Sequence, residues 1–306
     1  MARRYKTLQY ALEGVLLWTG MALFRVLPFR AAVWLAEGAA GAAFFFLRRR
    51  RAIAVTNILK AGIRAERPAA VALARQSFRH FAVSAVETLR LLGLPAERWR
   101  QHVRADWPKA LKAHAAERKQ GLVLAGAHVG NWEVGTLAFA ELMPVAGIAR
   151  PFDNPLAERR LRRVRFGGKV RILPKHGEDT GRLLEPLRDR EALAIMVDQH
   201  AGRRGLIVPF LGRPASTHAS VALLPMVTKA PLYFGYCLRT GPMAFRCAVV
   251  GPIPCPTTGD KEADLRGVLL RLNAEVEKVI RAAPEQYLWG HRRWRPQDEE
   301  RAAAGR

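Results

Sequence analysis

Acidic residues are scarce in this sequence. Its 306 residues include 26 Asp and Glu against 50 Lys and Arg, which gives a formal net charge of +24 at pH 7. This imbalance is too large for an ordinary soluble enzyme and indicates that the protein meets anionic partners. Nucleic acid, an anionic membrane surface and an acidic carrier protein all fit, and the charge alone does not choose among them.

Cysteine is also rare, and the histidines lack the spacing of a metal site. Cys237, Cys247 and Cys255 show no CxxC spacing and lie in or beside apolar, strand-like sequence. This argues against a zinc site and against a disulfide framework, and it favours buried thiols in a reducing compartment. The eight histidines form no HExxH motif, so we expect no metal and no other cofactor.

No apolar run is long enough to be a clean membrane span. Residues 7–29 are largely apolar, but Glu13 and Arg25 interrupt them, whereas a span needs about twenty consecutive apolar residues. Residues 31–47 carry Glu37 as their one charge and end in the arginine cluster 48–51. A helical hairpin with both ends in the cytoplasm, interfacial helices and a pair of ordinary buried helices all remain open.

We favour membrane contact for these segments, because the arginine cluster lies where anionic headgroups would be. No small-residue cleavage site follows the apolar sequence, so a removed signal peptide is not expected. The sequence thus predicts membrane-associating helices over residues 1–51, a main domain over residues 52–297 and a disordered polar tail over residues 298–306.

The most informative stretch is GLVLAGAHVGNWEVG at residues 121–135. Residues 122–125 form an apolar run bounded by glycines, as in a buried strand of a parallel sheet. Asn131 suits the N-cap of a helix over residues 132–142. His128 then lies at the carboxyl end of the strand, where ligands bind in open α/β sheets. Glu133 lies in the first turn of the helix.

His128 and Glu133 are the residue types of a general base and its orienting acid. A carboxylate on one imidazole nitrogen fixes the tautomer and raises the basicity of the other nitrogen, which suits removal of a proton from a hydroxyl. The alternative is a turn histidine bonded to the backbone, beside a glutamate that only complements the helix dipole.

Four blocks of the sequence resemble one family. HVGNWE at residues 128–133 resembles the H-x4-D/E box of glycerolipid acyltransferases, and its HxGNWE form is similar to the lipid A late acyltransferases, the lauroyl and myristoyl transferases. Three further stretches resemble that branch: RPFDNP at 150–155, VDQ at 197–199 followed by VPFLG at 208–212, and PEQYLWGHRRW at 284–294. The resemblance covers nearly the whole chain.

The resemblance implies acyl transfer from an acyl carrier protein thioester to a hydroxyl of a lipid A precursor, at the cytoplasmic face of the inner membrane. His128 would deprotonate the hydroxyl, Glu133 would orient the imidazole, and the alkoxide would attack the thioester directly. A covalent acyl-enzyme is disfavoured, since no cysteine lies near the box and none of the four serines stands in a GxSxG elbow. Another membrane lipid as acceptor (a phosphoglycolipid, lysophospholipid or aminolipid) and acyl-CoA as donor remain open.

A second group of residues is expected to contact the substrates. The resemblance implies this role for Arg150, whose guanidinium suits a phosphate, although a pair with Asp153 is the alternative. Asp198 follows an apolar strand, so it either lines the acceptor site or only caps its turn. The remaining members of this expected set are Asn131, Asp153 and Asn154.

Arginines crowd the segment 155–166 and would lie on all faces of a helix rather than on one. We expect this segment to be a docking surface for anionic lipid or an acidic carrier, and general solubility is the alternative. The arginines concerned are Arg159, Arg160, Arg162 and Arg163.

Strand-like and helical segments alternate, which predicts a mainly parallel sheet flanked by helices. The expected strands are 122–125, 145–149, 170–173, 192–197 and 206–210, with an antiparallel hairpin of 231–239 and 244–250 at one sheet edge. The expected helices are 68–92, 106–119, 132–142, 178–190, 214–227 and 260–281.

A nucleic-acid-binding protein is the alternative from a different class, because the charge of +24 suits it. No zinc finger, RNP motif, heptad zipper or helix-turn-helix spacing accompanies the charge. The intact His-Glu pair likewise disfavours a non-catalytic membrane scaffold. We therefore expect an enzyme without a nucleic-acid partner.

Overall fold

The computed structural model describes residues 2–92, 94–149, 153–155, 158, 170–174 and 181–305. Several residues for which the sequence predicts a role lie outside these ranges: Arg150, Arg159, Arg160, Arg162 and Arg163.

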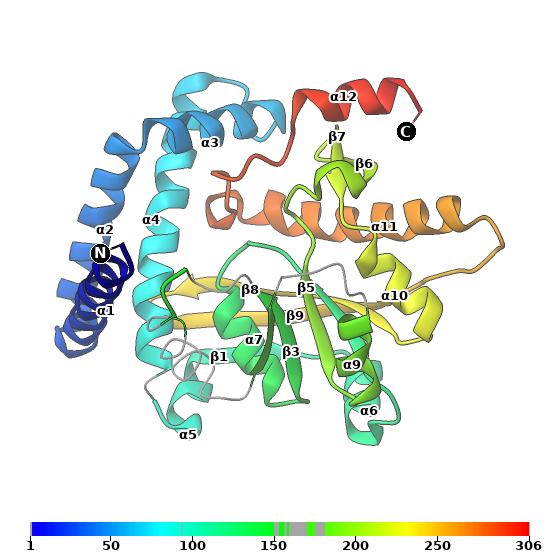
Figure 1. The fold of residues 1–306 in the computed structure, drawn as a ribbon, viewed down its shortest axis with the longest axis horizontal. Coiled ribbons are helices and arrows are strands. Elements are labelled where there is room, and N and C mark those ends of the chain that lie inside the picture. The colour runs from blue at the N-terminus through cyan, green and yellow to red at the C-terminus, as the bar shows by residue number, and fades with distance from the viewer. Residues whose placement is uncertain are drawn as a thin grey trace.

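A mostly parallel seven-stranded sheet forms the centre of the fold, as predicted (Figure 1). Its strands, in spatial order, are β1 (Val103–Asp106), β9 (Ala244–Ile253), β8 (Leu232–Gly241), β2 (Leu122–Gly126), β5 (Ala192–Met196), β3 (Val145–Ala149) and β4 (Val170–Pro174). Strands β8, β2, β5, β3 and β4 run parallel, while β9 is antiparallel to β8 and parallel to β1. Strand β2 is buried along four of its five residues, because parallel strands are covered on both faces.

The predicted hairpin is confirmed as β8 and β9, but it does not form the sheet edge. Strand β1 lies outside β9. This four-residue strand has two exposed residues in its middle, so it carries no apolar run that sequence patterning could detect. The helix predicted from residue 106 begins later, as α6 (Lys109–Glu117).

One predicted strand belongs elsewhere. Strand β6 (Leu206–Phe210) pairs antiparallel with β7 (Arg213–Thr217) in a separate two-stranded sheet, so its placement in the main sheet was wrong. Leu211 and Gly212 join the two strands, both with positive φ, as the tight turn of a two-residue hairpin requires. The helix predicted from residue 214 consequently begins only at α10 (Ser220–Thr228).

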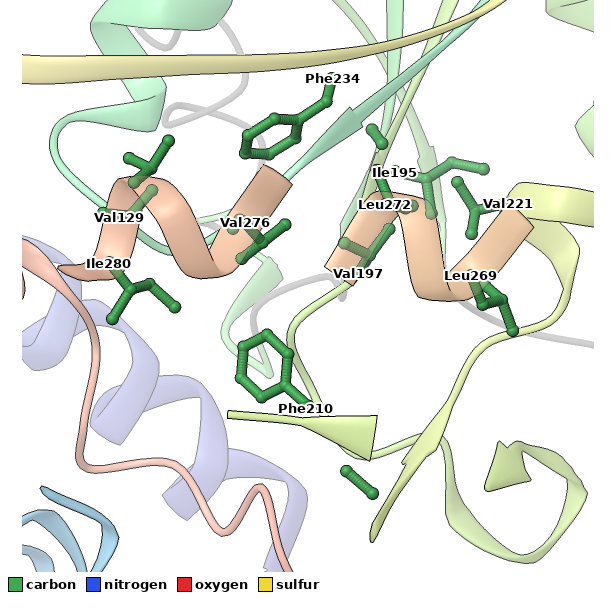
Figure 2. Packing of buried hydrophobic residues seen from close by; sticks show 14 of the residues in the cluster. Val129, Ile195, Val197, Phe210, Val221, Phe234, Leu269, Leu272, Val276 and Ile280 are labelled. Atoms are coloured by element: carbon green, nitrogen blue, oxygen red, sulfur yellow. The ribbon is translucent and has the colours of Figure 1, made fainter. Parts of the chain in front are cut away.

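Helix α11 (Lys261–Ala282) joins the main sheet to the β6–β7 hairpin. Asp260 caps it by accepting hydrogen bonds from the amides of Glu262 and Ala263. One face of the helix is buried in the largest hydrophobic cluster. Figure 2 shows Phe234 of β8 and Phe210 of β6 on opposite sides of this helix. The periodicity of the sequence predicted this helix within one residue at each end, because its apolar residues recur at helical spacing.

The remaining helices lie around this core and at its two ends (Figure 1). They are α3 (Arg48–Lys60), α4 (Arg67–Leu91), α5 (Ala96–Trp99), α7 (Trp132–Ala140), α9 (Gly181–Arg188) and α12 (Pro296–Ala303), with short 3-10 turns η1 (Arg100–His102), η3 (Gly202–Arg204) and η4 (Pro284–Gln286).

Helices α1 (Ala2–Val26) and α2 (Phe29–Phe46) stand beside α4 at one end of the molecule (Figure 1). Helix α2 buries every fourth residue, from Ala32 to Phe44, and in the described part of the chain it alone is long and apolar enough to cross a membrane by length and composition. Most of the exposed large apolar side chains lie between residues 12 and 47, with Trp34 72% and Phe46 74% exposed. Such a surface is typical of contact with a membrane or a partner.

The C-terminal segment is ordered where the sequence predicts a disordered tail. Residues 296–303 form α12, and its Asp298 is 1% exposed. The Asp298 carboxylate lies 3.0 Å from Nε2 of His200 and also accepts a hydrogen bond from the Arg295 amide. The polar composition misled the prediction, because the buried partner lies almost a hundred residues away in sequence.

Gly130, in the turn between β2 and α7, provides a test of how tightly this turn is packed. Its φ is +65°, and a Cβ added there would lie 1.9 Å from the Cys237 carbonyl oxygen. Gly62 has nearly the same φ, +63°, with nothing within 4 Å of an added Cβ. We predict that Gly62→Ala costs roughly 1–2 kcal/mol, the penalty of a left-handed alanine, and that Gly130→Ala costs more because the backbone must move.

Denaturant unfolding of both variants in detergent measures this difference. Equal losses of stability at the two positions would contradict the close packing of the turn against β8.

Candidate functional site

The site lies at the carboxyl ends of β2 and β5, which are neighbouring parallel strands. Gly126 and Met196 are paired at these ends. His128 follows the first strand by two residues and Asp198 follows the second by two residues, so the sheet brings the two side chains to the same level of one edge.

Asp198 holds His128 at two points. One carboxylate oxygen lies 2.8 Å from the ring Nδ1 atom, and the other accepts the backbone amide of His128 at 3.0 Å. The side chains are nearly enclosed, with 16% of His128 and 3% of Asp198 exposed. Because a carboxylate accepts, Nδ1 carries the proton and Nε2 is left as the basic nitrogen.

The environment keeps Asp198 ionised. Burial by itself would raise the pKa of this carboxyl, but the His128 ring and the two hydrogen bonds from His128 outweigh burial and lower the pKa below its usual value. The carboxylate therefore stays available to hold the ring and to stabilise a positive charge on it.

Two neighbouring side chains lie close to the His128 ring. Gln199 places its Nε2 atom 3.4 Å from it, and the Trp132 ring packs against the imidazole at 5.0 Å with an interplanar angle of 72°. The ring is thus held at Nδ1 by Asp198 and packed between Gln199 and Trp132.

The sequence pairs His128 with Glu133, and this pairing stays a prediction. Glu133 lies in the first turn of α7 and lines a cavity beside the His128 turn. The carboxylate on Nδ1 is that of Asp198, which the sequence placed at the same sheet edge but assigned to substrate contact or turn capping. The neighbouring order of β2 and β5, which the sequence does not reveal, decides this partnership.

Asn131 is confirmed as the N-cap of α7. Its side-chain oxygen accepts the Val134 amide at 3.1 Å, and its side-chain amide donates to Thr88 at 2.8 Å. It is 3% exposed. These contacts anchor the turn to α4, and a contact of Asn131 with substrate stays a prediction.

The described part of the RPFDNP block contacts helix α1. The Asn154 side chain donates to the Tyr10 carbonyl at 2.9 Å and to the Glu13 carboxylate at 3.1 Å. Asn154 is buried and Asp153 is exposed. The block therefore fixes α1 in place, and substrate contacts by these two residues stay predictions.

An apolar cavity of about 770 Å³ opens beside the His128 turn. Helices α1, α2 and α4 form its walls, and residues 130–133 form the end nearest His128. Trp132 lies between the cavity and His128, because its ring contacts both His128 and the cavity residue Phe81. The volume and the apolar lining suit an apolar ligand or the hydrocarbon chain of a larger ligand.

Further histidines, for which the sequence predicts no role, lie around the site. Nε2 of His291 accepts the backbone amide of His200 at 3.2 Å. Burial, with the nearby charges of His128 and Arg293, lowers the pKa of His291 to about 4 although Asp198 opposes the shift, so His291 is neutral at neutral pH. In the sequence, only the GHRRW motif at residues 290–294 indicates this cluster.

Arg293, from the same block, makes contacts that stabilise the fold. It is 1% exposed, and its guanidinium donates to the Ser216 carbonyl and the Thr217 hydroxyl of β7. Within the described residues, no group of three or more His, Cys, Asp or Glu side chains is arranged to hold a metal ion.

Comparison with known proteins identifies the family. The family of bacterial lipid A biosynthesis acyltransferases matches residues 1–296. The chain is 25% identical over 286 residues to the lipid A biosynthesis palmitoleoyltransferase of Escherichia coli (strain K12), covering 92% of this chain and 91% of that protein. It is 28% identical over 186 residues to the lipid A biosynthesis lauroyltransferase of the same strain, covering 60% of this chain and 58% of that protein.

A third relative is the lipid A biosynthesis acyltransferase of Haemophilus influenzae, 26% identical over 201 residues, which cover 64% of this chain and 63% of that protein. These matches confirm the resemblance first indicated by the HVGNWE box. The chain belongs to the bacterial lipid A biosynthesis acyltransferase family and is an acyl-transferring enzyme.

Proposed function

We propose that this protein transfers a fatty acyl chain from the thioester of an acyl carrier protein to a hydroxyl of a lipid A precursor, without a covalent acyl-enzyme. The observation that carries the proposal is a histidine fixed by a buried carboxylate at a sheet edge, next to an apolar cavity. The names of the two Escherichia coli relatives, a palmitoleoyltransferase and a lauroyltransferase, support the acyl chain as the transferred group.

His128 acts as the general base. Its Nε2 takes the proton of the acceptor hydroxyl while Nδ1–H stays bonded to Asp198, whose negative charge stabilises the imidazolium that forms. The alkoxide attacks the thioester carbonyl, and the tetrahedral intermediate collapses with release of the thiolate. The proton on Nε2 then goes to this thiolate, which restores the neutral ring.

Glu133 supplies a second negative charge at the start of the following helix, α7. It follows His128 by five residues, lies in the first turn of α7 and lines the cavity, so its carboxylate assists the imidazolium in this proposal. Backbone amides at the start of α7 are the proposed donors to the oxyanion, because the positive end of the helix dipole lies there.

The cysteines support direct transfer. Burial and the neighbouring Cys247 thiol raise the pKa of Cys237 well above its usual value, and burial raises the pKa of Cys255 to about 11. Both thiols are protonated at neutral pH, and a thiol attacks a thioester far more slowly than a thiolate does.

We propose the cytoplasmic face of the inner membrane as the place of work. The exposed apolar side chains of α1 and α2 are followed directly by Arg48, Arg49, Arg50 and Arg51 at the start of α3. Four arginines at a helix N-terminus oppose the helix dipole, so helix stability does not explain them. An anionic lipid surface would explain them, because each basic residue near such a surface contributes about 1 kcal/mol to membrane binding. The arginines of segment 155–166 are proposed to meet the acidic carrier.

The catalytic assignment predicts a ranked set of losses. His128→Ala should lower turnover by on the order of 10²- to 10⁴-fold, the contribution of a positioned base. Asp198→Asn should cost a comparable factor, because its amide group must face either the His128 amide or Nδ1, and neither can accept from it while Nδ1 is protonated. Transfer of labelled acyl chains from acyl carrier protein to purified acceptor measures both.

Two further variants give this experiment its controls. Asp106→Asn, on the outer strand β1, should behave as wild type. Glu133→Gln should lose less than Asp198→Asn if Asp198 orients the ring, and the reverse order would assign the dyad to Glu133. Full activity of His128→Ala would remove the mechanism, and lipid mass spectrometry with and without the gene would identify a different acceptor.

If the acyl chain binds in the cavity, the volume of the cavity should limit the length of the chain that is transferred. Gly20 lines the cavity and an added Cβ meets nothing within 4 Å. Gly20→Phe should fill part of the volume and shift the preferred donor toward shorter acyl chains. Competition among decanoyl, lauroyl, myristoyl and palmitoyl carriers gives the readout.

Gly38→Phe is the matched control for this prediction. Gly38 is on α2, has equally open space for a side chain and does not line the cavity. An unchanged chain preference in Gly20→Phe, or an equal shift in both variants, would mean that the acyl chain binds elsewhere.

A further inference from the structure

The loop that follows β5, residues 198–202, contacts both nitrogens of the His128 ring; we call it the β5 loop. Asp198 lies 2.8 Å from Nδ1, and the side-chain amide of the next residue, Gln199, lies 3.4 Å from Nε2. Because these two residues are consecutive, a shift of their backbone changes both contacts at once. The orientation of the ring therefore depends on how firmly the β5 loop is held.

His200, the third residue of the β5 loop, is anchored at three points. Its backbone amide donates to Nε2 of His291 at 3.2 Å, and its ring Nδ1 accepts the Gly202 amide at 2.9 Å. Since Nδ1 accepts, the ring proton is on Nε2, which donates to the Asp298 carboxylate at 3.0 Å. The ring is thus neutral and in one tautomer, and burial lowers the pKa of His200 in the same sense.

Asp298 of α12 connects the β5 loop to the C-terminal helix. The side chains of His200 and Asp298 are 4% and 2% exposed. The second carboxylate oxygen of Asp298 accepts the Arg295 amide at 3.1 Å and so caps α12. A carboxylate this deeply buried is stable only with such partners. The same side chain therefore starts the helix and holds the loop.

Helix α12 is itself fixed against the β6–β7 hairpin (Figure 1). Arg301 donates to the Gly205 carbonyl at 2.9 Å, and Glu299 pairs with Arg213 at the start of β7. The helix is thus attached to the hairpin at one side and to the β5 loop at the other. A contact from α12 can therefore restrain the loop.

We propose that Asp298 is a positioning residue of the transfer reaction, which holds the β5 loop against the His128 ring through His200. The inference rests on the proposed role of His128 as general base. It makes α12 a working part of the site, although the polar composition of this segment predicts disorder. Asp298 also lies beyond residues 1–296, the part of the chain that matches the family.

The test compares two carboxylates of α12. Asp298→Ala removes the contact with His200, whereas Glu299→Ala removes a more exposed pair with Arg213. Asp298→Ala should lower kcat by roughly 10- to 100-fold, as expected for lost support of a reacting group, with a smaller change in the KM for acyl carrier protein. Glu299→Ala should change neither. Wild-type kcat in Asp298→Ala, or an equal loss in both variants, would overturn the inference.

The tautomer of His128 separates positioning from simple support of the fold. In protein labelled with 15N-histidine, NMR should show His128 with its proton on Nδ1, and the signals are assigned by their absence in His128→Ala. Asp298→Ala should broaden these signals or add the tautomer protonated on Nε2, because Asp198 is no longer held in one place. A lower kcat with an unchanged His128 tautomer would contradict the positioning role.

His200→Phe covers the case in which Asp298→Ala fails to fold. It removes the same contact from the side of the loop and leaves Asp298 bonded to the Arg295 amide. Its kcat should fall by a similar factor, and wild-type kcat would overturn the inference. The variant that carries both substitutions should lose no more than either alone, because both remove one contact. Additive losses would show that Asp298 does not act through His200.

His128→Ala distinguishes this inference from the proposed function. If His128→Ala is inactive while Asp298→Ala and His200→Phe transfer acyl chains as the wild type does, only the role of Asp298 fails. If His128→Ala is fully active, the proposed general base fails.

Discussion

The two-point contact between Asp198 and His128 is the interaction on which the site depends. A carboxylate that is 3% exposed is costly unless its oxygens are paired, because it has lost nearly all of its hydration. Here one oxygen meets the ring and the other meets the backbone amide of the same residue. The same contact that satisfies the buried charge therefore also fixes the direction of the imidazole. The stability of the fold and the orientation of the ring therefore depend on the same two contacts.

The turn that carries His128 is held from several sides. His80 of α4 donates to the Gly130 carbonyl at 3.2 Å, and the Asn131 amide donates to the Cys237 carbonyl of β8 at 2.7 Å. Residues 286–288 add a third support through the backbone. A general base, the role proposed for His128, needs such fixed geometry to work without reorganisation. The cost of moving this turn is correspondingly high, since each support is buried.

Helix α4 couples the site to the proposed membrane side. It packs against α2 and α3, lines the apolar cavity and bonds to Asn131 at the start of α7. It also buries Glu87, whose carboxylate pairs with Arg239 of β8 and accepts the Met243 amide. The cavity therefore lies between the exposed apolar helices and the turn that carries His128, which is the path that the proposed function requires of an acyl chain entering from lipid.

The sequence by itself determined the local elements and placed His128 at the carboxyl end of a strand. The apolar run before Gly126, the N-cap at Asn131 and the helical periodicity of residues 261–282 act over a few residues, so their patterns are readable without the fold. Only the tertiary structure decided that β2 and β5 are neighbours and that Asp198, seventy residues away, lies on His128. The same holds for the β6–β7 hairpin and for the burial of Asp298 against His200. Strand order and buried polar pairs are set by contacts between distant segments, and no spacing along the chain records them.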